Sequence, residues 1–283
     1  MVLEDLFSAG WVRRRPYLAF VFGFFFTLIS FLLSALFFKS TMSVAMIFLT
    51  TLLLIPTLIM LLRMEEKVER KYGLKNFFRN HKDIFEVYLF SFLGVFVAFV
   101  VIGLGMYSRP ESYSQLFDFQ NRFLEFRQGI DKGVIQSFVQ GSIQPTISQA
   151  MGIFANNLLV VVICFVLSFF YGASAIFLII LNGSVFASFI VLVIKTISEN
   201  VAHGIQAFLF LMIHLVPEVS GFLLAAIAGG VASKAVIVEK KGSKAFKNVF
   251  KDATIMLLIA IGLVLISALL EVFVTARLFQ MFF

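Results

Sequence analysis

The stretch that decides how this chain folds runs from Asn200 to Ser233 and reads NVAHGIQAFLFLMIHLVPEVSGFLLAAIAGGVAS. It is apolar enough to enter a lipid bilayer, yet its middle carries His214, Pro217 and Glu218. A carboxylate at membrane depth costs about 2.5–3.5 kcal/mol on insertion scales, and such side chains usually face a bundle interior or a water-filled cavity. The stretch is therefore expected inside a helical bundle that the rest of the chain supplies.

The same stretch carries a helix-breaking signal. His214 and Glu218 are four residues apart, so a continuous helix would place them on one face. Pro217 removes a backbone donor and disfavours helical geometry at the residue before it. We therefore predict a break at Pro217, with a half-penetrating helix over about 201–214 and a full span over about 218–237.

Small residues follow the proline at helical spacing. Gly221, Ala225 and Gly229 recur every four residues and lead to Ser233. Such a stripe lets the backbones of two membrane helices approach closely. We expect these residues to be the helix-packing surface of the segment.

Composition excludes the water-soluble classes. The chain has 283 residues, of which 60% are hydrophobic and 14% charged. Its apolar runs are long and do not alternate with polar residues, which indicates helices and not barrel strands. The net charge of +7 comes from residues between the apolar runs, so we attribute it to membrane orientation and expect no nucleic-acid partner.

These runs predict an all-α, polytopic membrane protein with about seven crossings, one of them broken or re-entrant. A single integral membrane domain, 1–283, is expected to hold spans at 17–38, 42–62, 87–106, 153–171, 174–194, 201–237 and 253–276. The uncharged run 153–194 is too long for one span of about 20 residues, and Tyr171 to Ser174 is its predicted break.

Two segments between the spans are polar. Residues 63–86 are expected to form a loop, and 107–151 an external segment. Within the latter, apolar residues three or four apart predict an amphipathic helix over 112–139. Most Lys and Arg then fall on the N-terminal side of the membrane, which predicts a protein of the cell membrane with a cytoplasmic N-terminus and an external C-terminus.

Polar side chains inside the spans are the candidate site. Asn156, Asn157 and Asn182 are expected to form, with His214 and Glu218, a buried polar cluster in which Asn157 and Asn182 lie close to Glu218. Interhelical hydrogen bonds of this kind average about 0.6 kcal/mol, so they specify geometry more than they stabilise.

Three interpretations of the histidine and the carboxylate remain open. In the first, the buried carboxylate only hydrogen-bonds its neighbours. In the second, the pair belongs to an ion or proton pathway, as in transporters with broken helices. In the third, the spacing of four serves a metal, with His203 as a further ligand if the half-helix folds back. A second histidine on that helix and a general base are missing, so we expect no metal, no catalytic residue and no cofactor.

The order of these residues resembles the stage II sporulation protein M family over residues 150–238. The shared pattern comprises the Asn pair 156–157, Gly172, Asn182 with Gly183, His214, Glu218, and the Gly pair 229–230. The chain departs from it in having Ile213 and Leu215 beside the histidine and a proline at 217. The resemblance implies a membrane component of a larger assembly, and the family's namesake works with peptidoglycan hydrolases at the engulfing membrane.

We therefore expect a non-enzymatic integral membrane protein that scaffolds a membrane-associated assembly, with helix 112–139 facing partners. The alternative is a transporter or channel for a small solute, ion or lipid that uses Glu218 and His214. An intramembrane metal hydrolase is the third possibility. The expected partners are membrane lipids and either other proteins or further copies of the chain.

Overall fold

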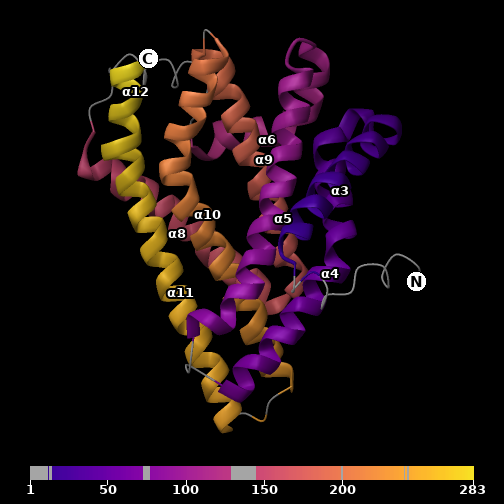
Figure 1. Ribbon diagram of the computed structural model, residues 1–283, viewed down its shortest axis with the longest axis vertical. Coiled ribbons are helices and arrows are strands. Elements are labelled where there is room, and N and C mark those ends of the chain that lie inside the picture. The colour runs from indigo at the N-terminus through magenta and orange to yellow at the C-terminus, as the bar shows by residue number, and fades with distance from the viewer. Residues whose placement is uncertain are drawn as a thin grey trace.

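The computed structural model describes residues 12, 15–72, 77–128, 145–198, 200–238, 240 and 242–283, and these are helical almost throughout, with no strand among them (Figure 1). The elements in order are α3 (Tyr17–Phe37), η1 (Lys39–Thr41), α4 (Met42–Tyr72), α5 (Phe77–Met106), α6 (Pro110–Gln128), α8 (Ile147–Phe170), α9 (Gly172–Ile197), α10 (Val201–Val238), α11 (Lys244–Leu270), η2 (Glu271–Thr275) and α12 (Ala276–Phe282).

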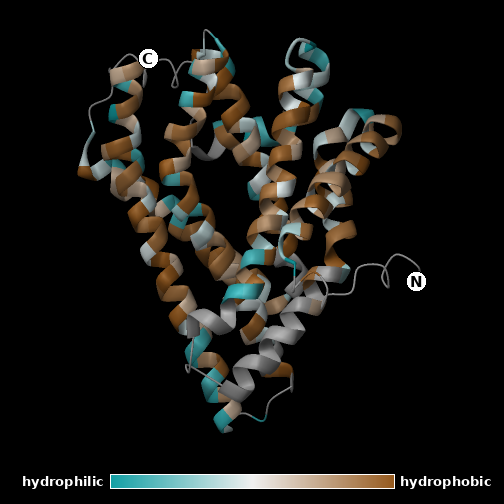
Figure 2. Cartoon of the chain, viewed as in Figure 1, coloured by the Kyte–Doolittle hydropathy of each residue, from teal (hydrophilic) through white to brown (hydrophobic). Residues whose placement is uncertain are grey.

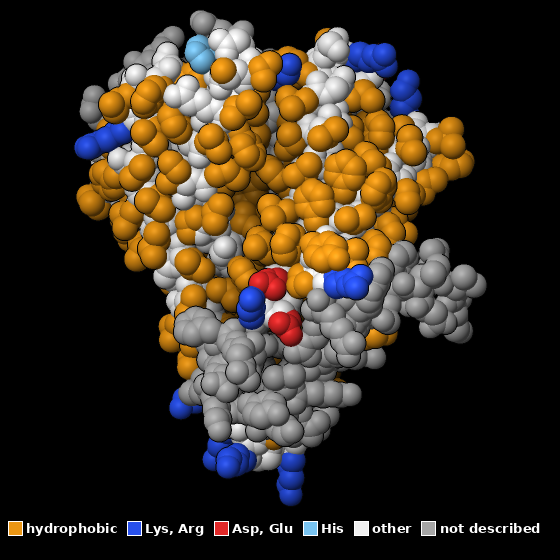
Figure 3. All heavy atoms as spheres, viewed as in Figure 1, with side chains coloured by type: hydrophobic (Ala, Val, Ile, Leu, Met, Phe, Trp, Pro, Cys, Tyr) orange, Lys and Arg blue, Asp and Glu red, His pale blue; other side chains and the backbone are white. Residues whose placement is uncertain are grey.

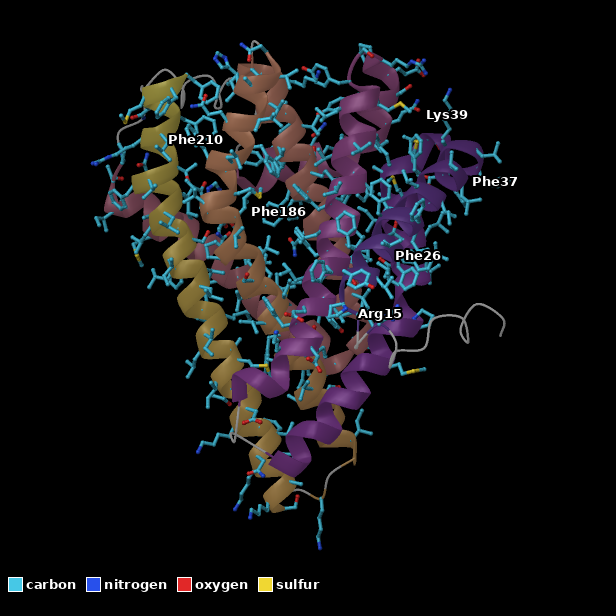
Figure 4. The ribbon with its side chains drawn as sticks, in the orientation of Figure 1. Arg15, Phe26, Phe37, Lys39, Phe186 and Phe210 are labelled. Atoms are coloured by element: carbon cyan, nitrogen blue, oxygen red, sulfur yellow. The ribbon has the colours of Figure 1, made fainter. Side chains whose placement is uncertain are left out.

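Seven helices in the described part are long and apolar enough to cross a membrane, which confirms the predicted polytopic all-α fold. Hydrophobic residues colour most of their length (Figure 2). On the face drawn in Figure 3, apolar side chains form a broad band, while Lys and Arg lie mainly towards its two ends. Arg15 and Lys39 illustrate this at opposite ends of α3 (Figure 4). This distribution is the one a bilayer selects, because charges avoid the hydrocarbon.

The break between the fourth and fifth spans falls at Tyr171, within the predicted Tyr171 to Ser174. α8 begins earlier than the predicted 153, because Thr146 caps it. The Thr146 hydroxyl accepts a hydrogen bond from the Gln149 backbone, and the Gln149 side chain accepts one from the Thr146 backbone. This reciprocal capping box starts the helix at Ile147. Of the predicted helix 112–139, α6 covers the part to Gln128, and 129–144 lie outside the described residues.

The predicted polar loop 63–86 is wrong for most of its length. α4 continues to Tyr72 and α5 already begins at Phe77. Charged residues such as Glu, Lys and Arg are good helix formers, so a helix can run out of the membrane without changing structure. The 31 residues of α4 extend about 46 Å at 1.5 Å per residue, well beyond a hydrocarbon core of about 30 Å.

The predicted break at Pro217 is also wrong. α10 is one helix of 38 residues that passes through the proline. Pro217 leaves the carbonyl of Ile213 without its helical donor, and the hydroxyl of Ser267 in α11 donates to the carbonyl of the next residue, His214, at 3.0 Å. In membranes, a proline is tolerated within a helix where neighbouring helices and hydroxyl groups hydrogen-bond the backbone around it. The segment is therefore a full crossing and not a re-entrant half-helix.

α10 lies at the centre of the second half of the bundle, with its most extensive interfaces against α11 and α8. Glycines allow both contacts. A Cβ atom at Gly229 would lie 2.2 Å from the carbonyl oxygen of Phe165 in α8, and one at Gly221 would lie 2.9 Å from that of Ala260 in α11. Ala225, between them, is fully buried. The stripe thus holds two different neighbours against one helix.

Candidate functional site: two carboxyl groups and a histidine between α10 and η2

His214 and Glu218 lie near the middle of α10, one turn apart, and both are buried, with 3% and 6% of their surface exposed. The continuity of the helix puts them on one face, which is the face towards α11. Figure 2 shows hydrophilic colour about halfway along the α10 ribbon. The site therefore lies deep between the two ends of a membrane-crossing helix.

The other half of the site comes from η2, a single π-helical turn, Glu271–Thr275, between α11 and α12. Single π turns inside α-helices are frequent at functional sites. One ligand atom each from His214, Glu218 and Glu271 lie within 4.8 Å of one another. Two carboxyl groups and an imidazole thus meet between helices that are separated by about fifty residues of sequence.

Two hydroxyl groups lie against His214 and Glu218. The Oγ1 atom of Thr275 lies 3.1 Å from Nδ1 of His214 and donates, at 3.5 Å, to the carbonyl of Phe210. The Oγ atom of Ser267 lies 3.0 Å from the carbonyl of His214 and 3.4 Å from Oε2 of Glu218. The hydroxyl of Ser267 has one proton to donate, and the carbonyl of His214 is its nearer acceptor. The carboxylate of Glu218 is therefore only weakly hydrogen-bonded by Ser267.

Aromatic rings close the site on the side of the C-terminus. Phe210, one turn before His214, contacts the rings of Phe279, Phe282 and Phe283 with centroid distances of 5.4–6.4 Å (Figure 4). These rings place apolar surface beside that end of the site, and a lower dielectric strengthens charge interactions.

His203 is not a further ligand in this arrangement. It precedes His214 by eleven residues of continuous helix, or about 16 Å along the axis. Its ring packs instead against Phe283 with a centroid distance of 5.6 Å. The fold-back that would have brought it to Glu218 required the break at Pro217, which is absent.

The three asparagines lie on other helices. Asn157 is buried in α8, Asn156 in the same helix is half-buried, and Asn182 in α9 is half-buried. The contacts that define the site, to Ser267, Glu271 and Thr275, come from α11 and η2. The association of Asn157 and Asn182 with Glu218 stays a prediction.

Glu271 is the residue of the candidate site that the sequence interpretation did not include. The predicted last span ended at 276, which placed Glu271 near the membrane surface. The helix continues to Phe282, so Glu271 lies a dozen residues from its end and at the depth of Glu218. Its signal was present in the sequence as a lone acidic residue inside an apolar run.

A second candidate site is the surface of α6. One side of this helix is anchored to the bundle through Leu116, Phe117 and Leu124, which are buried. The ring of Phe117 occupies the space beside Gly103 in α5, where a Cβ atom would lie 2.6 Å from it. Ser188 in α9 donates to Oδ1 of Asn121 at 2.6 Å, and the backbone of Phe119 donates to Ser43 in α4 at 3.3 Å. α6 is therefore fixed on three spans.

The opposite side of α6 faces outward. Its exposed charged and aromatic residues are three acids, one base and one ring: Glu111, Asp118, Phe119, Arg122 and Glu125. Arg122 pairs with Asp118 at 3.0 Å, and Phe119 stacks near Phe123 at 6.3 Å between centroids. The side chains of this face are thus arranged on a helix that the membrane bundle holds in place.

Comparison with protein families identifies the chain. A family model described as stage II sporulation protein M matches residues 89–276, which is well over half of the sequence. The chain belongs to the stage II sporulation protein M family. No curated protein sequence and no solved structure matches the chain.

The family match is longer than the stretch 150–238 over which the sequence pattern resembles the family. It begins inside α5 and ends at the first residue of α12, so it includes α6, the carboxyl groups of Glu218 and Glu271, and η2. α3 and α4 lie before it. The N-terminal hairpin is therefore an addition to the part of the chain that defines the family.

Proposed function

We propose that this stage II sporulation protein M family member is a non-enzymatic organiser of a membrane assembly, which docks a soluble protein domain on the exposed face of α6. The family is not a known family of enzymes. The proposal also assigns the chain to the cell membrane, with a cytoplasmic N-terminus and α6 on the external side, as the distribution of Lys and Arg favours.

The single observation that supports this role is the way α6 is held. An amphipathic helix that only rested on lipid would turn its apolar side towards the bilayer. α6 instead buries Phe117 and Leu116 completely within the protein and hydrogen-bonds α9 and α4. Rigid placement lowers the entropy cost of binding a partner, because the surface is already ordered.

The composition of the exposed face indicates the kind of partner. Three acidic side chains and one basic side chain lie on it, and Phe119 supplies an apolar contact among them. Interfaces of this type combine an aromatic anchor with a polar rim. A protein domain fits these features better than a lipid surface, because the charges of the face include both signs.

The test is purification of the full-length chain from native membranes in mild detergent, followed by mass spectrometry of co-purifying proteins. Phe119→Asp combined with Arg122→Glu changes the outer face and leaves the buried side of α6 intact. We expect a stoichiometric partner with the unaltered chain and its loss with the double variant. Lys39→Ser, an exposed change in η1 on the same side, is the matched control and retains the partner. Equal recovery of all partners from both variants contradicts the docking role.

A second function, transport of an ion or proton, is favoured by one specific observation. Glu218, Glu271 and His214 converge inside membrane-crossing helices, and intramembrane carboxylates commonly mark ion and proton paths. Reconstitution into liposomes loaded with a pH-sensitive dye tests it. Flux that falls in Glu218→Gln while the protein stays folded supports the pathway, and identical flux in both proteins removes Glu218 from any such mechanism.

A further inference from the structure

The site between α10 and α11 is rich in acceptors and poor in donors. Glu218 and Glu271 contribute four carboxylate oxygens, and the only described donor towards either is the hydroxyl of Ser267, which lies closer to a carbonyl. The ion pairs described elsewhere in the chain, such as Lys82 with Glu86 and Arg122 with Asp118, involve neither carboxylate, and no basic partner of either is found among the described residues. Buried charges are normally paired or coordinate metals.

His214 has a neighbour that suits the tautomer of a metal ligand. The Oγ1 atom of Thr275 lies 3.1 Å from Nδ1 of His214 and 3.5 Å from the carbonyl of Phe210, to which it can donate. With that proton on the carbonyl, Nδ1–H donates to Thr275 and the lone pair of the imidazole is on Nε2. Histidines that bind metals usually donate their other ring N–H to a neighbouring acceptor, which fixes the ring. Thr275 has that position here.

We propose that His214, Glu218 and Glu271 bind one divalent transition-metal cation, for which Zn²⁺ is the probe, and that this ion joins α10 to η2 within the membrane. A neutral imidazole and two carboxylates carry a charge of −2, which a divalent cation neutralises. A mixed nitrogen and oxygen set without sulfur suits Zn²⁺, Mn²⁺ or Fe²⁺ more than a thiolate-seeking metal. No such site follows from family membership.

The spacing of the ligands fits this ion after a small adjustment. Tetrahedral Zn²⁺ binds histidine nitrogen and carboxylate oxygen at about 2.0–2.2 Å, which places two ligand atoms of one ion about 3.4 Å apart. The three ligand atoms lie within 4.8 Å of one another. Rotations of the two glutamate side chains that move their oxygens by about 1.4 Å close the difference, through terminal torsions that are broad. Ser267 and water are available for the fourth position.

The test uses the full-length protein in mild detergent, stripped with EDTA, loaded with Zn²⁺, and dialysed. Mass spectrometry of the metal content is expected to give about one zinc ion per chain. X-ray absorption at the zinc edge is expected to show nitrogen and oxygen ligands with no sulfur. This readout needs no variant, so it holds even if substitutions in the site prevent folding. Thermal unfolding should shift upward with added Zn²⁺, because the ion binds the folded chain.

Matched variants locate the ion. His214→Gln, Glu218→Gln and Glu271→Gln should each lose the zinc and the thermal shift. His203→Gln and Glu125→Gln change the same residue types outside the site and should keep both. Zinc that is absent from the loaded wild type overturns the proposal and leaves the two carboxyl groups sharing protons. Sulfur ligation, or zinc lost in His203→Gln and kept in Glu218→Gln, also overturns it, because the ion would then lie elsewhere.

Discussion

Replacement of Gly229 by alanine should weaken the contact between α10 and α8. The added Cβ would lie 2.2 Å from the carbonyl oxygen of Phe165 and 2.9 Å from the Cβ of Ser168. An ordinary contact of a Cβ atom lies at 3.4–4 Å, so the two helices must separate by about 1 Å or shift along each other. Both obstacles are backbone or the start of a short side chain, which cannot rotate away.

The size of the effect follows from two opposing terms. Overpacking of a close contact costs about 1–3 kcal/mol. Alanine in place of glycine inside a helix contributes about 1 kcal/mol in the stabilising direction. A Cβ atom added at Gly262 in α11 would have no neighbouring atom within 4 Å, so Gly262→Ala carries only the second term. The propensity terms cancel when the two variants are compared, and the difference of about 1–3 kcal/mol measures the contact alone.

The assay is equilibrium unfolding of each variant in mixed detergent micelles, followed by circular dichroism and by an orthogonal probe such as proteolysis. Gly229→Ala should unfold at a lower fraction of denaturing detergent than the wild type, and Gly262→Ala at the same or a higher one. Equal midpoints for the two variants would refute the close packing of α10 on α8 at this point.

Further expectations concern the anchoring of α6 and the accessibility of the bundle. Phe117→Ala should destabilise α6 by about 3–5 kcal/mol and expose it to limited proteolysis, since the ring is fully buried, whereas the exposed Phe119→Ala should change the cleavage pattern little. Ser188→Ala removes the 2.6 Å hydrogen bond to Asn121 and should lower stability by about 0.5–1.5 kcal/mol, measured in the same detergent titration. Cys164 is buried, so maleimide should label it only after denaturation; rapid labelling of the folded protein would contradict its position in the core.

The membrane crossings were predictable because each depends on local composition. A run of about 20 apolar residues determines a span without reference to its neighbours. The parts that were wrong depend on partners. Pro217 breaks a helix in water, yet in α10 the hydroxyl of Ser267 satisfies a nearby carbonyl, and that hydroxyl is about fifty residues away in sequence. The charged ends of α4 and α5 resemble a loop in a hydropathy pattern, because hydropathy reports on the membrane and not on helicity.

The candidate site was half predictable for the same reason. The spacing of His214 and Glu218 placed both on one face, and their burial followed from the cost of a carboxylate in lipid. Glu271 needed the pairing of α10 with α11 and the π turn that aims it, and neither leaves a periodic signal in the sequence. The external segment was recognisable as amphipathic, but its apolar side turned out to be covered by protein.

The unbroken length of α10 has a mechanical consequence. From Pro217 to Val238 the helix extends about 30 Å, and the proline lies beside the polar cluster in the middle of the membrane. Proline turns are the places where long helices bend. A change of about 5° in the bend of α10 at Pro217 would move its end at Val238 by about 3 Å. Occupancy or protonation of a few buried atoms would therefore displace the end of α10 at Val238, without any solute crossing the bilayer.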